Sequence, residues 1–373
     1  MRQILALILM LMAGAASASS LVVGANVVNP MRGSAAARIQ VEDQLAAANV
    51  TSVRAPLDDG YGNISDQAIE YASDLASRGV RLDLILGFRY RKGAPVRAYM
   101  PDRFPQMWGG SPLSSADPDA SESYFKELFD RLDSSRLTLG SIELGNEINW
   151  AAFNAEFPLP GEGRVFGAAD LASDPEGQRI AIGYLRYLEI LRRLKAVRDR
   201  SRYNHHTPII SAGLAGFSPG AINSRGEDAV TINATLWFLR QHGLDRLVDG
   251  YGVHVYPDAS NLGDPSADRR RLNSLRDDIL ASCSRKADGH PCWITEWGFP
   301  NQSKVCPLDD RRRGASIRQF WEMISELSPD YRVGGLFYYS WDSSPWAKTP
   351  EADSVFRCGS LTEAGRLAIA APR

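Results

Sequence analysis

Short apolar runs alternate with longer amphipathic stretches along almost the whole chain. Eight runs have the length and composition of buried strands: 21–28, 51–56, 82–88, 139–144, 208–214, 248–255, 292–297 and 334–341. Helical patterns fall between them, at about 35–48, 65–78, 121–134, 175–200, 228–242, 266–284, 310–327 and 361–371. This alternation favours parallel βαβ units. Eight such units predict an α/β fold, a (β/α)8 (TIM) barrel.

The first residues have the pattern of a targeting segment. A basic start, Met1-Arg2, precedes an apolar run from Ile4 to Ala13 and the small residues Ala16-Ser17-Ala18. This order predicts a secretory signal peptide over 1–18, and hence a secreted or periplasmic protein. We expect the rest, 19–373, to be a single barrel domain without a membrane span, because no later apolar run is long enough to cross a bilayer.

Composition excludes one class of partner. The formal net charge is −2, so there is no basic excess to attract nucleic acid. Hydrophobic residues make up 44% of the chain, which is enough for a large core. We expect a monomer that needs no cofactor.

The four cysteines all lie in the last quarter of the chain, at Cys283, Cys292, Cys306 and Cys358. An even number in a secreted protein indicates disulfides, and three pairings are possible. We favour Cys283–Cys292, which closes a short loop, and Cys306–Cys358, which ties a late loop to the C-terminal region. A structural zinc site is disfavoured because no C-x2-C pair occurs.

Polar and aromatic residues stand at the ends of the expected strands. Active sites of barrel enzymes form at the face where the strands end. The residues in question are Arg54, Asn146, Glu147, His254, Tyr256, Glu296 and Trp341.

Two of these residues, Glu147 and Glu296, are glutamates that close apolar runs. A carboxylate at the end of a buried strand is costly unless it has a partner or a task. Two carboxylates that face one site are the equipment for cleaving a glycosidic bond, with one as acid and base and the other as nucleophile or base. Such an acid needs a raised pKa, whereas a nucleophile must stay ionised.

With Asn146-Glu147 after the fourth strand and Glu296 after the seventh, the chain resembles the clan A retaining glycoside hydrolases, in particular the cellulase-like family 5 and family 39. The resemblance implies that Glu147 is the acid/base and Glu296 the nucleophile. It further implies that Asn146 binds the sugar 2-hydroxyl and that Arg54 keeps the nucleophile charged.

The resemblance extends to three further positions. His254 and Tyr256, in Val253-His254-Val255-Tyr256-Pro257, match positions that contact the nucleophile and the sugar. Trp341 matches an aromatic platform beneath the sugar.

Three further residues stand near these positions. Trp150 and Trp297 follow strand ends and could stack on sugar rings. Glu143 lies four residues before Glu147, and we interpret it as a paired structural carboxylate. No H-x-x-H or similar cluster indicates a metal site.

We therefore expect a retaining β-glycosidase that acts within an oligosaccharide or polysaccharide chain. Three alternatives remain open. One is a transglycosylase that uses the same site, and another is a non-catalytic polysaccharide-binding barrel in an export or biofilm assembly. A metal-dependent deacetylase is the third, and the lack of a ligand cluster disfavours it.

Overall fold

The computed structural model describes residues 21–58, 64–98, 110–217, 226–256, 289–301, 305–327, 329–342 and 353–370, with 273, 276 and 303 as isolated positions. The predicted signal peptide, 1–18, and the expected helix at 266–284 lie outside these ranges, except for the two isolated positions. The division into a signal peptide and one domain over 19–373 therefore stays a prediction.

Parallel strands form the centre of the molecule. In chain order they are β1 (Val22–Asn26), β2 (Ser52–Pro56), β3 (Arg81–Leu86), β4 (Ser141–Leu144), β6 (Ile209–Ile210), β7 (Leu214–Ala215), β9 (Tyr251–Val255), β10 (Cys292–Trp297) and β11 (Val333–Tyr338). Each lies within one of the eight apolar runs or overlaps it. The sheet order is β6-β4-β3-β2-β1-β11-β10-β9-β7.

The two ends of this order belong to one segment of chain, 209–215. Its first half, β6, pairs with β4, and its second half, β7, pairs with β9. A further parallel bridge joins Ile210 to Gly250, directly before β9. The segment thus takes the place of the fifth of eight barrel strands, and it closes the sheet into the predicted (β/α)8 barrel.

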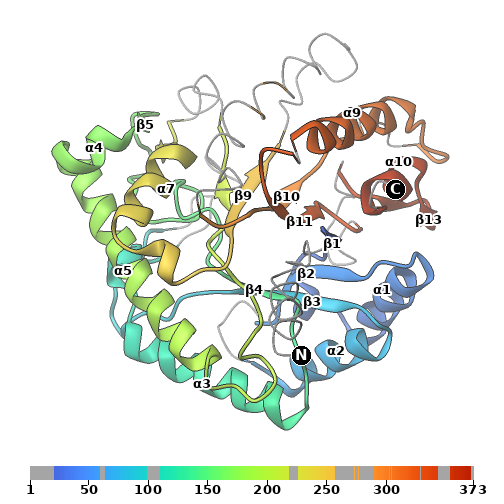
Figure 1. Cartoon of the computed structure of the whole chain (residues 1–373), viewed down its shortest axis with the longest axis horizontal. Coiled ribbons are helices and arrows are strands. Elements are labelled where there is room, and N and C mark those ends of the chain that lie inside the picture. Colours follow the sequence, from blue (N-terminus) through green and yellow to red (C-terminus); the bar gives the residue numbers. More distant parts are fainter. Residues whose placement is uncertain are drawn as a thin grey trace, which may run out of the picture.

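Helices surround the barrel, as Figure 1 shows. They are α1 (Ala35–Ala47), α2 (Asp66–Ser77), α3 (Pro118–Ser134), α4 (Ala168–Ser173), α5 (Pro175–Arg198), α7 (Ile232–Gln241), α9 (Arg311–Leu327) and α10 (Glu363–Ile369). Side-chain caps fix several starts; for example, Ser65 accepts a hydrogen bond from the Ala68 amide. None of the described helices combines the length and the apolar character that crossing a membrane requires.

Short elements fill the loops between these strands and helices. Three are single 3-10 turns, η1 (Pro30–Arg32), η2 (Leu113–Ser115) and η3 (Leu244–Arg246). Two small sheets pair β5 (Val165–Phe166) with β8 (Ala229–Val230), and β12 (Phe356–Arg357) with β13 (Ser360–Leu361).

Large side chains fill the lower barrel. Trp293 stacks on Phe337 with ring centroids 6.3 Å apart, and both pack with Ile210. Gly334 and Gly335 make room for the indole, since a Cβ at either position would lie 2.4 Å from Trp293. Because this layer is solid, the site can only form above it, at the ends of the strands.

A disulfide links the segment after β10 to the turn between β12 and β13. Cys306 is bonded to Cys358, as predicted. Cys292 is also disulfide-bonded. Its expected partner, Cys283, lies outside the described residues.

Candidate active site

Arg54, on β2, is the hub of the polar layer above the barrel core. Its side chain is 2% exposed, and all five of its N–H groups donate. Nε and Nη2 bind the two Glu143 oxygens at 2.8 and 2.7 Å. Nη1 binds Glu296 Oε1 at 2.7 Å, and Nη2 also binds Asn146 Oδ1 at 3.0 Å. Glu143 is thus the paired structural carboxylate that the sequence predicts.

Glu296 receives two strong hydrogen bonds. One is from Arg54, and the other is from the Tyr256 hydroxyl, which donates to Oε2 at 2.6 Å. Hydrogen bonds to an ionised oxygen are among the strongest in proteins. Both donors therefore favour the carboxylate form of Glu296.

Glu147 lies in a different environment, directly after β4. It has a backbone φ of +45°, and its amide donates to the Gly213 carbonyl at 2.8 Å. Non-glycine residues with such a φ persist where the surrounding structure imposes it, and they cluster at functional sites. Glu147 Oε1 is 2.7 Å from Nδ1 of His254, which is fully buried.

His254 is held close over the barrel interior. Nδ1 faces Glu147 and also lies 3.5 Å from Glu296 Oε2. Nε2 faces Gly213, where a Cβ would approach to 2.1 Å, so only glycine fits beneath the ring. One imidazole therefore touches both carboxylates of the pair.

The two glutamates titrate as a coupled pair. Burial raises the pKa of Glu147, and the negative charge of Glu296 raises it further, while His254 opposes the rise. Burial also raises the pKa of Glu296, but Arg54 and Tyr256 lower it. Because Glu296 has these donors, a single proton on the pair resides on Glu147.

A cavity of about 460 Å³ opens beside Glu296. Its lining includes Arg54, Asn146 and Glu296 together with the aromatic side chains Phe88, Phe153 and Tyr339. Since Asn146 Oδ1 accepts from Arg54, its amide N–H groups remain as donors for a ligand. Aromatic walls with a few polar groups are typical of small-molecule and sugar sites.

The expectation that Trp297 stacks on a sugar is wrong. Trp297 is 1% exposed and stacks on Phe320 of α9, with centroids 4.1 Å apart. A register shift between Ile294 and Glu296 turns Glu296 inward. Neighbouring strand residues point to opposite faces, so Trp297 turns outward into the helix layer.

Trp341 is not the aromatic platform either. It is fully buried outside the barrel, where it stacks on Phe356 at 5.7 Å and its Nε1 lies 3.4 Å from Gln44 Oε1 on α1. Tyr339, two residues earlier, lines the cavity and meets Tyr256 edge-on at 6.0 Å. Because β11 ends at Tyr338, strand alternation does not predict which later aromatic residue turns inward.

Trp150 stands behind the cavity wall. Its Nε1 donates to Glu227 Oε2 at 3.1 Å, and its ring packs against Phe153 and Phe217. Phe153, 42% exposed, lines the cavity, whereas Trp150 does not. The structure thus gives Trp150 a supporting position.

Sequence reasoning missed Asn26, which ends β1. Its Oδ1 accepts from Arg54 Nη1 at 2.8 Å, and its Nδ2 donates to the carbonyls of Thr295 and Phe337 at 3.0 and 3.2 Å. Asn26 therefore links Arg54 to β10, which carries Glu296, and to β11. The signal was present, because a polar residue near the end of an apolar run is the criterion that selected Arg54.

The pair and His254 could in principle bind a cation. One ligand atom each from Glu147, His254 and Glu296 lie within 4.8 Å of one another. However, the Arg54 guanidinium is 2.7 Å from Glu296 and opposes a second positive charge there. The donor set therefore fits a proton-sharing carboxylate pair better than a metal site.

Comparison with known proteins yields structural relatives only. No family model matches the chain, and no curated protein matches its sequence. A fungal β-1,4-galactanase is 15% identical, with a TM-score of 0.53 and coverage of 93% of each chain. The endo-1,4-β-mannanase from Rhizomucor miehei is 14% identical, with a TM-score of 0.55 and coverage of 94% of this chain and 93% of its own.

A family 39 glycoside hydrolase from Bacteroides cellulosilyticus WH2 is also similar. It is 15% identical, with a TM-score of 0.51 and coverage of 93% of this chain and 62% of its own. At such identities the likeness establishes the fold. The expected resemblance to clan A glycoside hydrolases is thus confirmed at the level of the barrel.

Proposed function

We propose that this protein is a retaining glycoside hydrolase that cleaves β-linked glycosidic bonds, with Glu147 as acid/base and Glu296 as nucleophile. The observation that carries the proposal is the asymmetric pair. Carboxylate oxygens of Glu147 and Glu296 lie within 4.8 Å of each other; Arg54 and Tyr256 both donate to Glu296, whereas His254 is the side-chain partner of Glu147. Retaining enzymes hold their carboxyl groups about 5–5.5 Å apart, whereas inverting enzymes need about 6.5–9.5 Å.

The first step follows from these environments. Glu147 donates its proton to the leaving glycosidic oxygen while a Glu296 oxygen attacks the anomeric carbon. The carbon–oxygen bond to the leaving sugar breaks, and an ester between the sugar and Glu296 forms. Arg54 and Tyr256 keep Glu296 ionised until it attacks.

The second step reverses the roles. The ester on Glu296 carries no charge, so the pKa of Glu147 falls and its carboxylate can accept a proton from water. Water attacks the anomeric carbon, the ester bond breaks, and Glu296 leaves as a carboxylate. A sugar hydroxyl in place of water would give transglycosylation at the same site.

Two finer proposals concern substrate and location. The aromatic cavity and the polysaccharide-cleaving enzymes among the structural relatives support action within a β-linked polysaccharide. The Cys306–Cys358 disulfide supports secretion, because such bonds persist in oxidising compartments.

The test is a screen of purified protein on β-glucans, mannans, xylans and galactans, beside Glu147→Gln and Glu296→Gln. We expect the wild type to release reducing sugar from at least one polymer, and each variant to lose activity by about three orders of magnitude or more. Glu143→Gln is the comparison variant, since this carboxylate also binds Arg54 but is not clustered with Glu147, His254 and Glu296, and we expect it to lose less activity than either of the other two variants.

Two results would overturn the proposal. One is near-wild-type activity in Glu296→Gln, because this result would exclude Glu296 as the nucleophile. The other is a wild type that binds polymers but cleaves none, which favours a non-catalytic binding barrel.

A further inference from the structure

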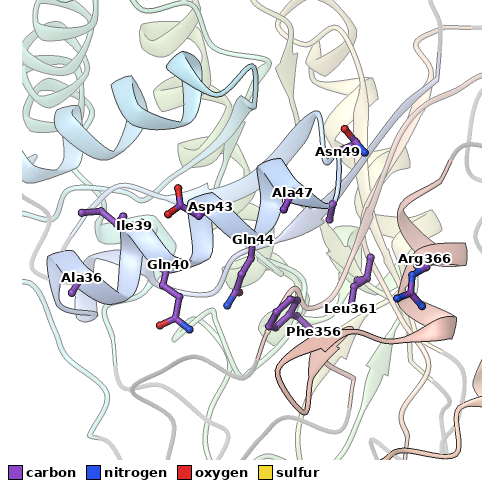
Figure 2. Close-up of a pocket in the computed structure, with 11 residues that line it drawn as sticks. Ala36, Ile39, Gln40, Asp43, Gln44, Ala47, Asn49, Phe356, Leu361 and Arg366 are labelled. Atoms are coloured by element: carbon purple, nitrogen blue, oxygen red, sulfur yellow. The ribbon is translucent and has the colours of Figure 1, made fainter.

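A second and larger hollow, of about 840 Å³, lies on the outside of the barrel between α1 and the C-terminal elements β12, β13 and α10. Figure 2 shows its two walls. One wall is a face of α1 from Ala36 to Asn49, which is about 20 Å of helix and its end. The other wall is formed by Phe356, Leu361 and Arg366. We call this hollow the α1 groove.

The side chains that face the α1 groove suit a neutral hydroxyl-rich ligand. Gln40 and Gln44 lie one helical turn apart, and both side chains extend to the side of α1 on which Phe356 lies (Figure 2). A carboxamide both donates and accepts, as pairs of sugar hydroxyls require. The charged residues that line the groove are Arg366 and Asp43, and Asp43 is ion-paired with Arg78, so the groove offers too little positive charge for an anionic polymer.

The inner aromatic residue is held rigidly. Phe356 stacks on Trp341, whose indole Nε1 lies 3.4 Å from Gln44 Oε1. That contact orients the Gln44 amide with its N–H groups free to donate. Exposed Gln40 makes no hydrogen bond within the described part of the chain, so its amide is available.

The α1 groove and the active-site cavity are lined on both sides by residues that are near each other in sequence. On one side Asn29 and Arg32 line the cavity, and α1 carries the chain into the groove from Ala36. On the other side Tyr339 lines the cavity, and Trp341 supports Phe356 in the groove. Because Arg32 at the cavity and Ala36 at the α1 groove are only four residues apart, their Cα atoms lie no more than about 14 Å from each other, a distance that a long polymer can span.

We infer that the α1 groove is a second binding site for an uncharged polysaccharide. The groove binds one part of the polysaccharide while the active site cleaves another part of the same molecule. The inference rests on the proposed function for the identity of its ligand. It implies that the enzyme binds a long polymer more tightly than a short oligosaccharide of the same linkage, because only the polymer reaches both sites.

The test compares long and short substrates in the double variant Gln40→Ala/Arg366→Ala. We expect KM on the polymer to rise by about five-fold or more, because two hydrogen-bonding side chains are lost. The kcat/KM on a trisaccharide of the same linkage should stay within two-fold. The matched control, Gln241→Ala/Arg200→Ala, makes the same chemical change at exposed positions on another face.

A binding measurement separates this inference from the proposed function. In the Glu147→Gln background, hydroxyethylcellulose, galactomannan and galactan are each cast into native gels. At least one should retard the protein, and the double substitution should reduce that retardation while the control does not. If retardation depends on the groove but the wild type cleaves nothing, the proposed function fails and the groove stands.

Three outcomes would contradict the inference that the α1 groove binds polysaccharide. They are an equal rise of KM on long and short substrates, retardation that the double substitution leaves unchanged, and no retardation by any of the three polymers. A polymer-free dimer that dissociates in the double variant would also overturn it, since a second copy of the chain would then fill the groove.

Discussion

Arg54 donates to Glu296 from Nη1 at 2.7 Å while it grips Glu143 with two further nitrogens. One buried cation thus serves two carboxylates, of which only Glu296 lines the cavity. The pairing with Glu143 fixes the position of the guanidinium. The contact with Glu296 keeps the Glu296 carboxylate ionised for attack. The structural and catalytic roles of Arg54 can be separated by the variants that follow.

Replacing Arg54 should slow the reaction and shift its pH dependence. Arg54→Lys keeps a charge but loses the planar fork, so we expect kcat to fall by about 10²–10³-fold. The pKa of Glu296 should rise without its main donor, so the acidic limb of the kcat/KM profile moves to higher pH. Glu143→Gln should not move that limb upward, because it removes a negative charge that raises the pKa of Glu296.

Removing the Tyr256 hydroxyl should have a smaller effect in the same direction. Tyr256→Phe deletes the 2.6 Å hydrogen bond to Glu296 Oε2, and a bond to a charged group contributes about 1.5–3 kcal/mol. We expect kcat/KM to fall by about 10–100-fold and the acidic limb to move to higher pH. Tyr184→Phe, which loses a buried bond to Thr235 far from the pair, should alter melting temperature but not the profile. An unchanged limb in Tyr256→Phe would contradict this role.

Tyr339 and Trp341 should differ in what they affect. Tyr339 lines the cavity, so Tyr339→Ala should lower kcat/KM by about ten-fold or more through lost stacking. Trp341 is buried between α1 and Phe356, so Trp341→Phe should lower the melting temperature and leave kcat/KM on a short substrate nearly unchanged. Steady-state kinetics and thermal unfolding on both variants check this, and the reverse pattern would restore Trp341 as the platform.

These aromatic residues show where prediction from sequence succeeds and fails. The apolar runs predicted the positions of the eight barrel strands, because strands covered by helices are apolar almost throughout. The same logic selected Arg54, Glu147, His254, Tyr256 and Glu296, since a polar group at the end of a buried strand needs a partner, and the structure brings these side chains into contact with one another.

It failed for Trp297 and Trp341, because side-chain direction after a strand depends on register shifts and on turns. The shift at Ile294/Glu296 and the end of β11 at Tyr338 are set by pairing across the barrel. No local pattern in the sequence reports that pairing.

The barrel interior should also give a pH-dependent stability. Asp83 is 3% exposed and accepts from Ser141 Oγ at 2.7 Å, and burial raises its pKa from 3.8 to about 7. The folded state therefore holds the proton more tightly than the unfolded state does. Its contribution to the free energy of unfolding is full below about pH 4 and is lost as the pH rises through 7.

Asp83→Asn should remove that dependence. We expect the variant to be more stable than the wild type at pH 8, by up to roughly 4 kcal/mol at 1.4 kcal/mol per pKa unit, and the gain to shrink toward pH 4. Urea unfolding at several pH values measures it, with exposed Asp330→Asn as the control. An Asp83→Asn curve parallel to the wild type across this range would rule out the Asp83 account.

In the proposed mechanism Glu296 forms a covalent ester with the sugar. The most direct measurement is mass spectrometry after incubation with activated 2-deoxy-2-fluoro β-glycosides of glucose, mannose and galactose, which slow the second step more than the first. We expect one added glycosyl unit on the peptide that contains Glu296, and none in Glu296→Gln. An adduct on any other residue, or turnover of the natural substrate with inversion at the anomeric carbon, would contradict it.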